Sequence, residues 1–113
     1  MKKKDIKVYI ASPYTIGDQE DNVVRSLAVS HRLINLGYIP FAPLLYHYQH
    51  ILFPQDYETW MKIDFAWLEA CDYLIRLSGE SSGADREVVF AKEKGIPVFY
   101  SIEELNEYTS KLS

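Results

Sequence analysis

Strand-like and helix-like segments alternate along the whole chain, and this alternation constrains the fold more than any other feature. Strands are expected at residues 6–11, 38–43, 73–77 and 97–100, and helices at residues 19–36, at 57–70, from 82 up to Gly95 and after Ser101. A chain that places a helix after each strand builds a parallel sheet covered by helices. The sequence therefore predicts an α/β fold.

The length and charge of the chain limit what it can be. At 113 residues it fits one compact domain, residues 1–113, with no room for a separate cofactor domain. The formal net charge of −4 argues against a nucleic acid polymer as partner, because such binding needs clustered Lys and Arg. The short basic run Lys2–Lys4 is interpreted as a solubilising tail.

The chain lacks the sequence signals of membrane, secreted and metal-cluster proteins. No stretch approaches the roughly 18 apolar residues of a membrane span, and the start has no signal-peptide pattern. We therefore expect no membrane partner and a cytoplasmic location. A single cysteine, Cys71, excludes an internal disulfide and a thiolate metal cluster. Neither a metal nor a cofactor is expected.

A ligand is expected at the carboxyl ends of the first and third strands. Open parallel sheets bind ligands at the strand ends where the winding reverses direction. The loops at these ends contain Ser12-Pro13-Tyr14 and Ser78–Gly83. The second strand is bounded by prolines, which suits an edge position.

The segment Leu44–Pro54 is rich in aromatic residues and has no clear periodicity. Its side chains either line a site, with His47 as the candidate ligand-binding residue, or belong to a loop that covers the sheet. The covering loop is the preferred interpretation, because such loops usually carry some apolar surface.

Asp64 is an acid on an apolar helical stripe. The stripe also contains Trp60, Trp67 and Cys71, at spacings of four, three and four residues. Burial would raise the pKa of this carboxyl group and let it donate a proton near neutral pH. Alternatively the side chain bonds a backbone amide or a buried tyrosine, or lies in water at the edge of the stripe. The residues alone leave these interpretations evenly balanced.

Glu87 is a second acid that is predicted to face the interior. It shares one helix face with Ala84, Val88 and Ala91, and this face should pack against the sheet. Because Glu87 lies within two turns of the helix N-terminus, the helix dipole should favour its anion. The two acids are thus predicted to be pushed toward different protonation states. Glycosidic chemistry needs such a pair, since one carboxylate attacks the anomeric carbon and the other protonates the leaving group.

The residues before this helix could hold a phosphate. Ser81, Ser82 and Gly83 supply hydroxyl and amide donors at a helix start. Ser82 is predicted to cap the helix in a capping-box pattern with Asp85, whereas Ser81 has no structural explanation. Gly83 could also simply permit a close backbone approach. Arg86 is expected to point into solvent.

Together these features resemble the nucleoside 2-deoxyribosyltransferase superfamily, which includes the 2'-deoxynucleoside 5'-phosphate N-hydrolases. The resemblance spans most of the chain and rests on Val8–Pro13, Gly37–Pro43, Asp64–Asp72 and Ser81–Glu87 in that order. It implies a flavodoxin-like or Rossmann-like three-layer fold with a parallel sheet of four to five strands. It also implies a homodimer or a higher homo-oligomer, and a small nucleoside or nucleotide as substrate.

The resemblance implies roles for individual residues. Glu87 matches the family nucleophile, Asp64 the acid that protonates the leaving base, and Tyr9 the tyrosine that orients the nucleophile. Ser81 matches a serine that binds the 5'-phosphate in the nucleotide hydrolases. The predicted substrate-binding residues are Ser12, Pro13, Tyr14, His47, Ser81 and Gly83.

Two departures from the family pattern concern the substrate. Ala84-Asp85-Arg86 replaces a glycine-rich first turn, and Ser12-Pro13 replaces Gly-Ser. The need for a 5'-phosphate therefore stays open. The polar residue that a neighbouring subunit donates in the family is not recognisable after Tyr100.

The expected activity is that of an N-glycosidase acting on a nucleoside or a nucleoside 5'-monophosphate. Either water or a second base could complete the reaction, so hydrolysis and deoxyribosyl transfer both stay open. The alternative is a non-catalytic nucleotide-binding or sensing module of the same fold. A phosphoacceptor receiver domain has a similar topology, but the strand ending Ile10-Ala11-Ser12 offers no acceptor Asp.

Overall fold

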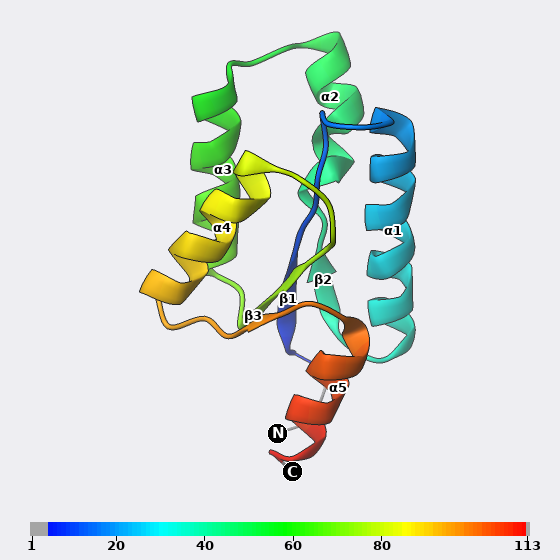
Figure 1. The fold of residues 1–113 in the computed structure, drawn as a ribbon, viewed down its shortest axis with the longest axis vertical. Helices are drawn as coiled ribbons and strands as arrows, with labels where there is room; N and C mark the ends of the chain where they lie inside the picture. Colours follow the sequence, from blue (N-terminus) through cyan, green and yellow to red (C-terminus); the bar gives the residue numbers. More distant parts are fainter. Residues whose placement is uncertain (1–4, 113) are drawn as a thin grey trace.

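The computed structural model describes residues 5–112, which form a parallel sheet with helices on both faces (Figure 1). The predicted tail Lys2–Lys4 lies outside these residues. The strands are Lys7–Ala11 (β1), Ile39–Phe41 (β2), Tyr73–Arg76 (β3) and Val98–Phe99 (β4), and the helices are Gln19–Asn35 (α1), His47–Leu52 (α2), Tyr57–Glu69 (α3), Ser82–Glu93 (α4) and Ile102–Ser110 (α5). A 3-10 turn, Pro43–Tyr46 (η1), precedes α2. The predicted three-layer α/β fold is confirmed.

The strand order β2-β1-β3-β4 fixes where the winding of the sheet reverses. All neighbouring strands are parallel, and β2 lies at an edge, as its prolines predicted. From β1 the chain moves outward to β2 and then crosses back to β3 on the other side of β1. The reversal therefore lies between β1 and β3, where a ligand was expected.

The first face of the sheet carries a largely apolar core. Val8 and Ile10 of β1 pack there with Leu33 of α1 and Leu105 of α5, and all four side chains are almost fully buried. Figure 1 shows α1 along this side of the strands, with α5 near the amino ends of the strands. We call this side the α1–α5 face.

The other residues of β1 point to the second face of the sheet, which we call the α3–α4 face. Tyr9 and Ala11 point to it and pack with Leu68 of α3 and Ala91 of α4. The split follows from the strand itself, because successive side chains of a strand point to opposite faces of the sheet. One strand thus supplies both cores.

Side-chain caps mark the starts of α1, α3, α4 and α5. Asp18, Asp56 and Ser101 cap α1, α3 and α5. The predicted cap of α4 is wrong by one residue, because Ser81 occupies the N-cap and its hydroxyl accepts a 3.0 Å hydrogen bond from the Ala84 amide. Ser82 is already helical, so its hydroxyl does not take that position.

The preferred interpretation of the segment 44–54 as a covering loop is wrong, because most of it is helical. It forms η1 and α2, followed by an exposed stretch that leads to α3. His47 is buried at the start of α2, whereas Tyr48 is exposed. Among residues 5–112 no helix combines the length and the apolar character that crossing a bilayer would require.

Candidate active site

A cavity of about 360 Å³ lies at the carboxyl ends of β1 and β3, where the winding reverses. Its walls include Ser12 and Tyr14 after β1, Tyr46 and His47 of η1 and α2, Trp60 and Asp64 of α3, and Ser81, Gly83 and Glu87 of the α4 region. Seven of the nine predicted site residues are therefore in its lining, and the two exceptions are Tyr9 and Pro13.

Glu87 is a buried acid at the base of this cavity. It projects from the second turn of α4, on the helix face that also buries Ala84 and Ala91, and only 5% of it is exposed. Tyr9 on β1 donates a short hydrogen bond from its hydroxyl to Glu87 Oε2. Burial, reinforced by the neighbouring acids, raises the pKa of Tyr9 well above its ordinary value. The tyrosine therefore keeps its proton and acts as a donor that orients Glu87.

Asp64 of α3 is in hydrogen-bonding contact with Glu87, so the cavity contains a pair of carboxyl groups. Burial raises the pKa of Asp64 to about 6. Burial first, and the nearby charge of Asp64 second, raise the pKa of Glu87 to about 8. Two adjacent carboxylates in a poorly solvated site repel each other, which makes the doubly ionised pair unfavourable.

The prediction that the helix dipole would favour the Glu87 anion is wrong. Glu87 is the sixth residue of α4, whereas the dipole acts mainly on the first turn, and burial outweighs what remains of it. The hydrogen bond from Tyr9 and the charge of Arg76 do lower the pKa of Glu87, but by less than burial raises it. Of the interpretations left open for Asp64, the structure supports the partly buried acid with a raised pKa.

This pair holds one proton around neutral pH. With pKa values near 6 and 8, one of the two groups is protonated and the other ionised between these values. These values belong to the pair, and a shift of the proton along the hydrogen bond moves it from one carboxyl group to the other. A pair in which one carboxylate acts as nucleophile and the other carboxyl group as acid also needs one proton in total.

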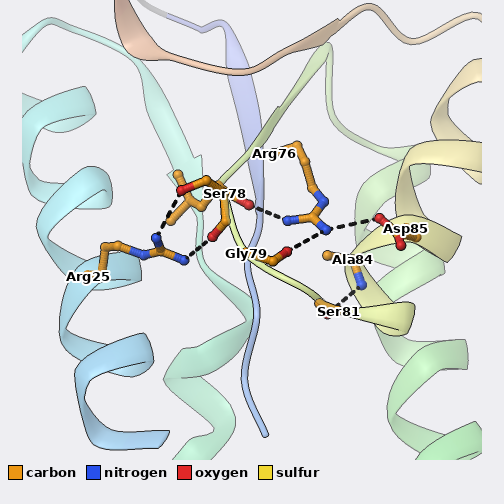
Figure 2. A network of polar contacts seen from close by, with 8 residues as sticks. Arg25, Arg76, Ser78, Gly79, Ser81, Ala84 and Asp85 are labelled. Carbon is orange, nitrogen blue, oxygen red and sulfur yellow. Dashed lines mark hydrogen bonds and ion pairs between the residues drawn. The ribbon is translucent and has the colours of Figure 1, made fainter. Parts of the chain in front are cut away.

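The loop between β3 and α4 is tied down by two arginines (Figure 2). Arg76 of β3 donates hydrogen bonds to the carbonyls of Leu77 and Gly79, and its guanidinium lies 2.9 Å from the Asp85 carboxylate. Arg25 of α1 donates to the Ser78 carbonyl at 2.6 Å from the other side. The loop that positions the first turn of α4 is therefore anchored to both neighbouring layers.

Arg76 is the site-supporting residue that the sequence analysis missed. It occupies the last position of a strand whose other residues are all apolar, and it is only 9% exposed. Its charge lies on the α3–α4 face, where it lowers the pKa of Glu87. A buried arginine at the carboxyl end of a strand next to the predicted loop was the signal that could have revealed it.

Pro13 has a structural position instead of a place in the cavity wall. It is buried, and its ring carbon lies 3.0 Å from where a Cβ on Gly79 would be. Gly79 also has a φ of +121°, so this contact needs glycine. Ser12 does line the cavity, although its hydroxyl already donates to the Pro13 carbonyl at 2.9 Å.

Gly83 allows helices α3 and α4 to approach each other at the cavity. A Cβ at this position would lie 3.3 Å from the Tyr57 hydroxyl and 3.8 Å from the Met61 sulfur. Arg86, in contrast, points away from the cavity as expected and pairs with Glu58 at 2.9 Å. The start of α4 therefore presents small residues to the cavity and its charged residues elsewhere.

Aromatic side chains form one wall of the cavity. The rings of Tyr46 and Trp60 lie 5.2 Å apart, and Trp60 Nε1 donates a 2.7 Å hydrogen bond to His50 Nδ1. Tyr14 and His47 continue the wall and are joined by a 2.6 Å hydrogen bond. Flat, partly polar walls of this kind suit a planar ligand that also carries polar groups.

The architecture is an α/β fold that is similar to the fold of a 2-deoxyribosyltransferase. A solved structure of a 2-deoxyribosyltransferase from the psychrotolerant bacterium Bacillus psychrosaccharolyticus matches it with a TM-score of 0.57 and 22% sequence identity, covering 85% of this chain and 75% of that chain. At this identity the likeness concerns the fold. The chain itself belongs to the DUF7768 family, a domain of unknown function, whose model matches residues 6–101. No curated protein matches the sequence.

Proposed function

We propose that this protein is an N-glycosidase that cleaves the bond between base and sugar of a nucleoside or a nucleoside 5'-monophosphate, with Glu87 as nucleophile. The observation that carries the proposal is the pair of acids, Glu87 and Asp64, which contact each other in the lining of the cavity, with Tyr9 hydrogen-bonded to Glu87. The likeness in fold to a 2-deoxyribosyltransferase supports the same bond type.

The proposed first step uses both carboxyl groups. Substrate binding places the shared proton on Asp64 and leaves Glu87 ionised. A Glu87 oxygen attacks C1' of the sugar, the C1'–N bond breaks, and its electron pair stays with the base nitrogen. Asp64 gives its proton to the departing base, so that the base leaves neutral. Tyr9 keeps its proton and holds Glu87 in place through the hydrogen bond to Oε2.

The second step releases the sugar from Glu87. Water or a second base attacks C1', the ester bond to Glu87 breaks, and the carboxylate is restored. Asp64, now ionised, takes the proton that the attacking group loses. Water gives hydrolysis and a second base gives transfer, since the two outcomes share the same covalent intermediate.

The cavity also suggests how the rest of the substrate binds. The aromatic wall formed by Tyr46 and Trp60 would face a planar base. Ser82 and Gly83, in the first turn of α4, offer backbone amides to a 5'-phosphate. Ser81 now has a structural role as the helix cap, so its hydroxyl would reach a phosphate only beside that hydrogen bond.

Base release from a panel of nucleosides and nucleoside 5'-monophosphates, with and without an acceptor base, tests the proposal. Glu87→Gln should lower the rate at least about a thousandfold, because the amide cannot form the ester. Glu93→Gln, which changes an exposed acid on the same helix, serves as the matched control and should leave the rate unchanged.

Two results would contradict the proposal. Undiminished base release by Glu87→Gln would exclude the nucleophile. Nucleotide binding without base release from any member of the panel would indicate the non-catalytic binding or sensing module instead. The homo-oligomer that we also propose is tested separately, by the molar mass of the protein in solution with and without substrate.

A further inference from the structure

A chain of three polar side chains leads from the cavity to the protein surface. The Tyr14 hydroxyl lies 2.6 Å from His47 Nδ1, and His47 Nε2 lies 2.7 Å from a carboxylate oxygen of Glu20. The three residues come from different segments, namely the loop after β1, the start of α2 and the first turn of α1. The Glu87–Asp64 chemistry does not use them.

The ends of this chain differ in their surroundings. The side chain of His47 is 1% exposed, whereas that of Glu20 is 64% exposed. Tyr14 and His47 both line the cavity, and Asn22 fixes the Tyr14 backbone with a 3.1 Å hydrogen bond to its carbonyl. A buried imidazole whose two nitrogens both have partners cannot exchange them for water, so the partners determine its tautomer.

The Glu20 carboxylate sets the direction of every hydrogen bond in the chain. An ionised carboxylate only accepts hydrogen bonds, so His47 must carry a proton on Nε2 and donate it to Glu20. In the neutral ring Nδ1 then has a lone pair and accepts the proton of the Tyr14 hydroxyl. The pKa of Tyr14 is raised, by burial first and by Glu20 second, so this hydroxyl stays protonated.

A tyrosine whose hydroxyl proton is donated to His47 can only accept hydrogen bonds from another partner, through its oxygen lone pairs. We infer that Glu20 and His47 fix Tyr14 as a hydrogen-bond acceptor in the cavity, which selects nucleosides that present a donor there. The donor is an amino or ring N–H group of the base or a hydroxyl group of the sugar, because these are the donors of a nucleoside. The inference rests on the proposed function for the class of ligand, and it assigns Tyr14 as a specificity-determining residue.

Substitutions of Glu20 can remove or reverse the direction of the hydrogen bonds in this chain. Glu20→Gln can either accept or donate at His47 Nε2, so it permits both tautomers. Glu20→Lys can only donate, so it forces the proton onto Nδ1, which then donates to the Tyr14 oxygen and frees the tyrosine proton for the cavity. Asp21→Lys makes the same charge change in the same helical turn while leaving the contact between Glu20 and His47 in place.

Dissociation constants measured on the Glu87→Gln background, where turnover cannot interfere, give the first test. The base arm compares 2'-deoxyadenosine with its 6-methoxy analogue, which replaces the amino donor by an acceptor. It also compares 2'-deoxyinosine with its N1-methyl derivative, which removes a ring N–H donor. The sugar arm compares 2'-deoxyadenosine with its 3'-O-methyl and 5'-O-methyl derivatives, each of which lacks one hydroxyl donor. The unmodified nucleoside should bind roughly tenfold to a hundredfold more tightly in one arm, which identifies the source of the donor.

The variants should then change that preference in a defined order. Glu20→Gln and Tyr14→Phe should reduce it severalfold, Glu20→Lys should reverse it, and Asp21→Lys should preserve it. Equal binding in both arms, or a preference that Glu20→Lys leaves intact, overturns the inference. Binding preference without base release by the unmodified protein would overturn the proposed function and leave this inference standing.

Nitrogen NMR of the imidazole rings gives a second test that needs no ligand. The chain has three histidines, so His31→Gln and His50→Gln variants assign the His47 signals. We expect the proton on Nε2 in the unmodified protein and on Nδ1 in Glu20→Lys. A proton on Nδ1, or on both nitrogens, in the unmodified protein at neutral pH contradicts the inference.

Discussion

The two faces of the central sheet are built from the same strands, but they bury different kinds of side chain. On the α1–α5 face Val8 and Ile10 pack in a cluster of apolar side chains that includes Leu33 and Leu105. On the α3–α4 face the intervening Tyr9 meets a buried carboxyl group, Glu87, which in turn contacts Asp64. The α1–α5 face buries mainly apolar side chains, whereas the α3–α4 face buries a pair of acids beside its apolar side chains.

This difference shows where the fold gains and loses stability. A fully buried leucine contributes about 1.5–3 kcal/mol relative to an exposed one, whereas a buried carboxyl group costs free energy unless it is neutral or well paired. The raised pKa values of Glu87 and Asp64 are the sign of that cost. We therefore expect the α1–α5 face to determine stability and the α3–α4 face to determine activity.

Matched substitutions on the two faces should separate these quantities most strongly. Leu33→Ala removes a side chain with no exposed surface and should lower the free energy of unfolding by about 2–5 kcal/mol. Base release per folded molecule should stay the same. Glu87→Gln should do the reverse, with stability kept or increased and activity lost. Denaturant unfolding and base-release assays measure both, and equal effects of the two variants on stability would break the contrast.

The pH dependence of stability should come largely from the α3–α4 face. Both acids have raised pKa values, so the folded protein retains protons that the unfolded chain has released. Their stabilising effect is complete below about pH 4 and is lost as the pH rises to about 8, the folded pKa of Glu87. Unfolding curves should therefore lose a few kcal/mol over this range, and Glu87→Gln should flatten the curve. A loss that is equally steep in Glu87→Gln would contradict the assignment.

Arg76 should be the support on which the loop before α4 depends. Arg76→Met keeps much of the volume but leaves the carbonyls of Leu77 and Gly79 without their donor. We expect a loss of about 1–3 kcal/mol in stability. The alkaline limb of the pH–rate profile should also move to higher pH, because the charge that lowers the pKa of Glu87 is gone. An unchanged profile would show that Arg76 acts on the loop alone.

Tyr9→Phe should give the smallest effect, of roughly tenfold on the rate of base release. The activity of a pair that must hold one proton should be bell-shaped, with limbs near pH 6 and pH 8. The tyrosine hydrogen bond lowers the pKa of Glu87, so its loss should move the alkaline limb upward. A limb that stays in place would mean that Tyr9 only packs against Glu87.

The sequence predicted features that depend on neighbouring residues better than features that depend on contacts between distant residues. The alternation of strands and helices and the spacing of apolar residues are local patterns. They predicted the parallel sheet and the position of Glu87 on the inward face of its helix. The cap of α4 depends on one residue of register between Ser81 and Ser82, which local patterns do not resolve. The protonation of Glu87 is set by burial against β1, at a distance of 78 residues in sequence from Tyr9.

Contacts between distant loops were beyond local patterns as well. His47 was a candidate because of its residue type, but its partners Tyr14 and Glu20 lie 33 and 27 residues away in the chain. Arg76 was only part of the expected strand at residues 73–77, because the partners that reveal its role lie in the following loop and helix. The fold was readable from periodicity, whereas the polar contacts required the three-dimensional structure.

The covalent intermediate tests the central proposal most directly. Protein mixed with a 2'-fluoro nucleoside, whose substituent slows breakdown of the intermediate, is quenched, digested and analysed by mass spectrometry. The account predicts that one glycosyl group is attached to the peptide that contains Glu87, and that the adduct is absent in Glu87→Gln. Base release with no adduct, or an adduct on another residue, would contradict it.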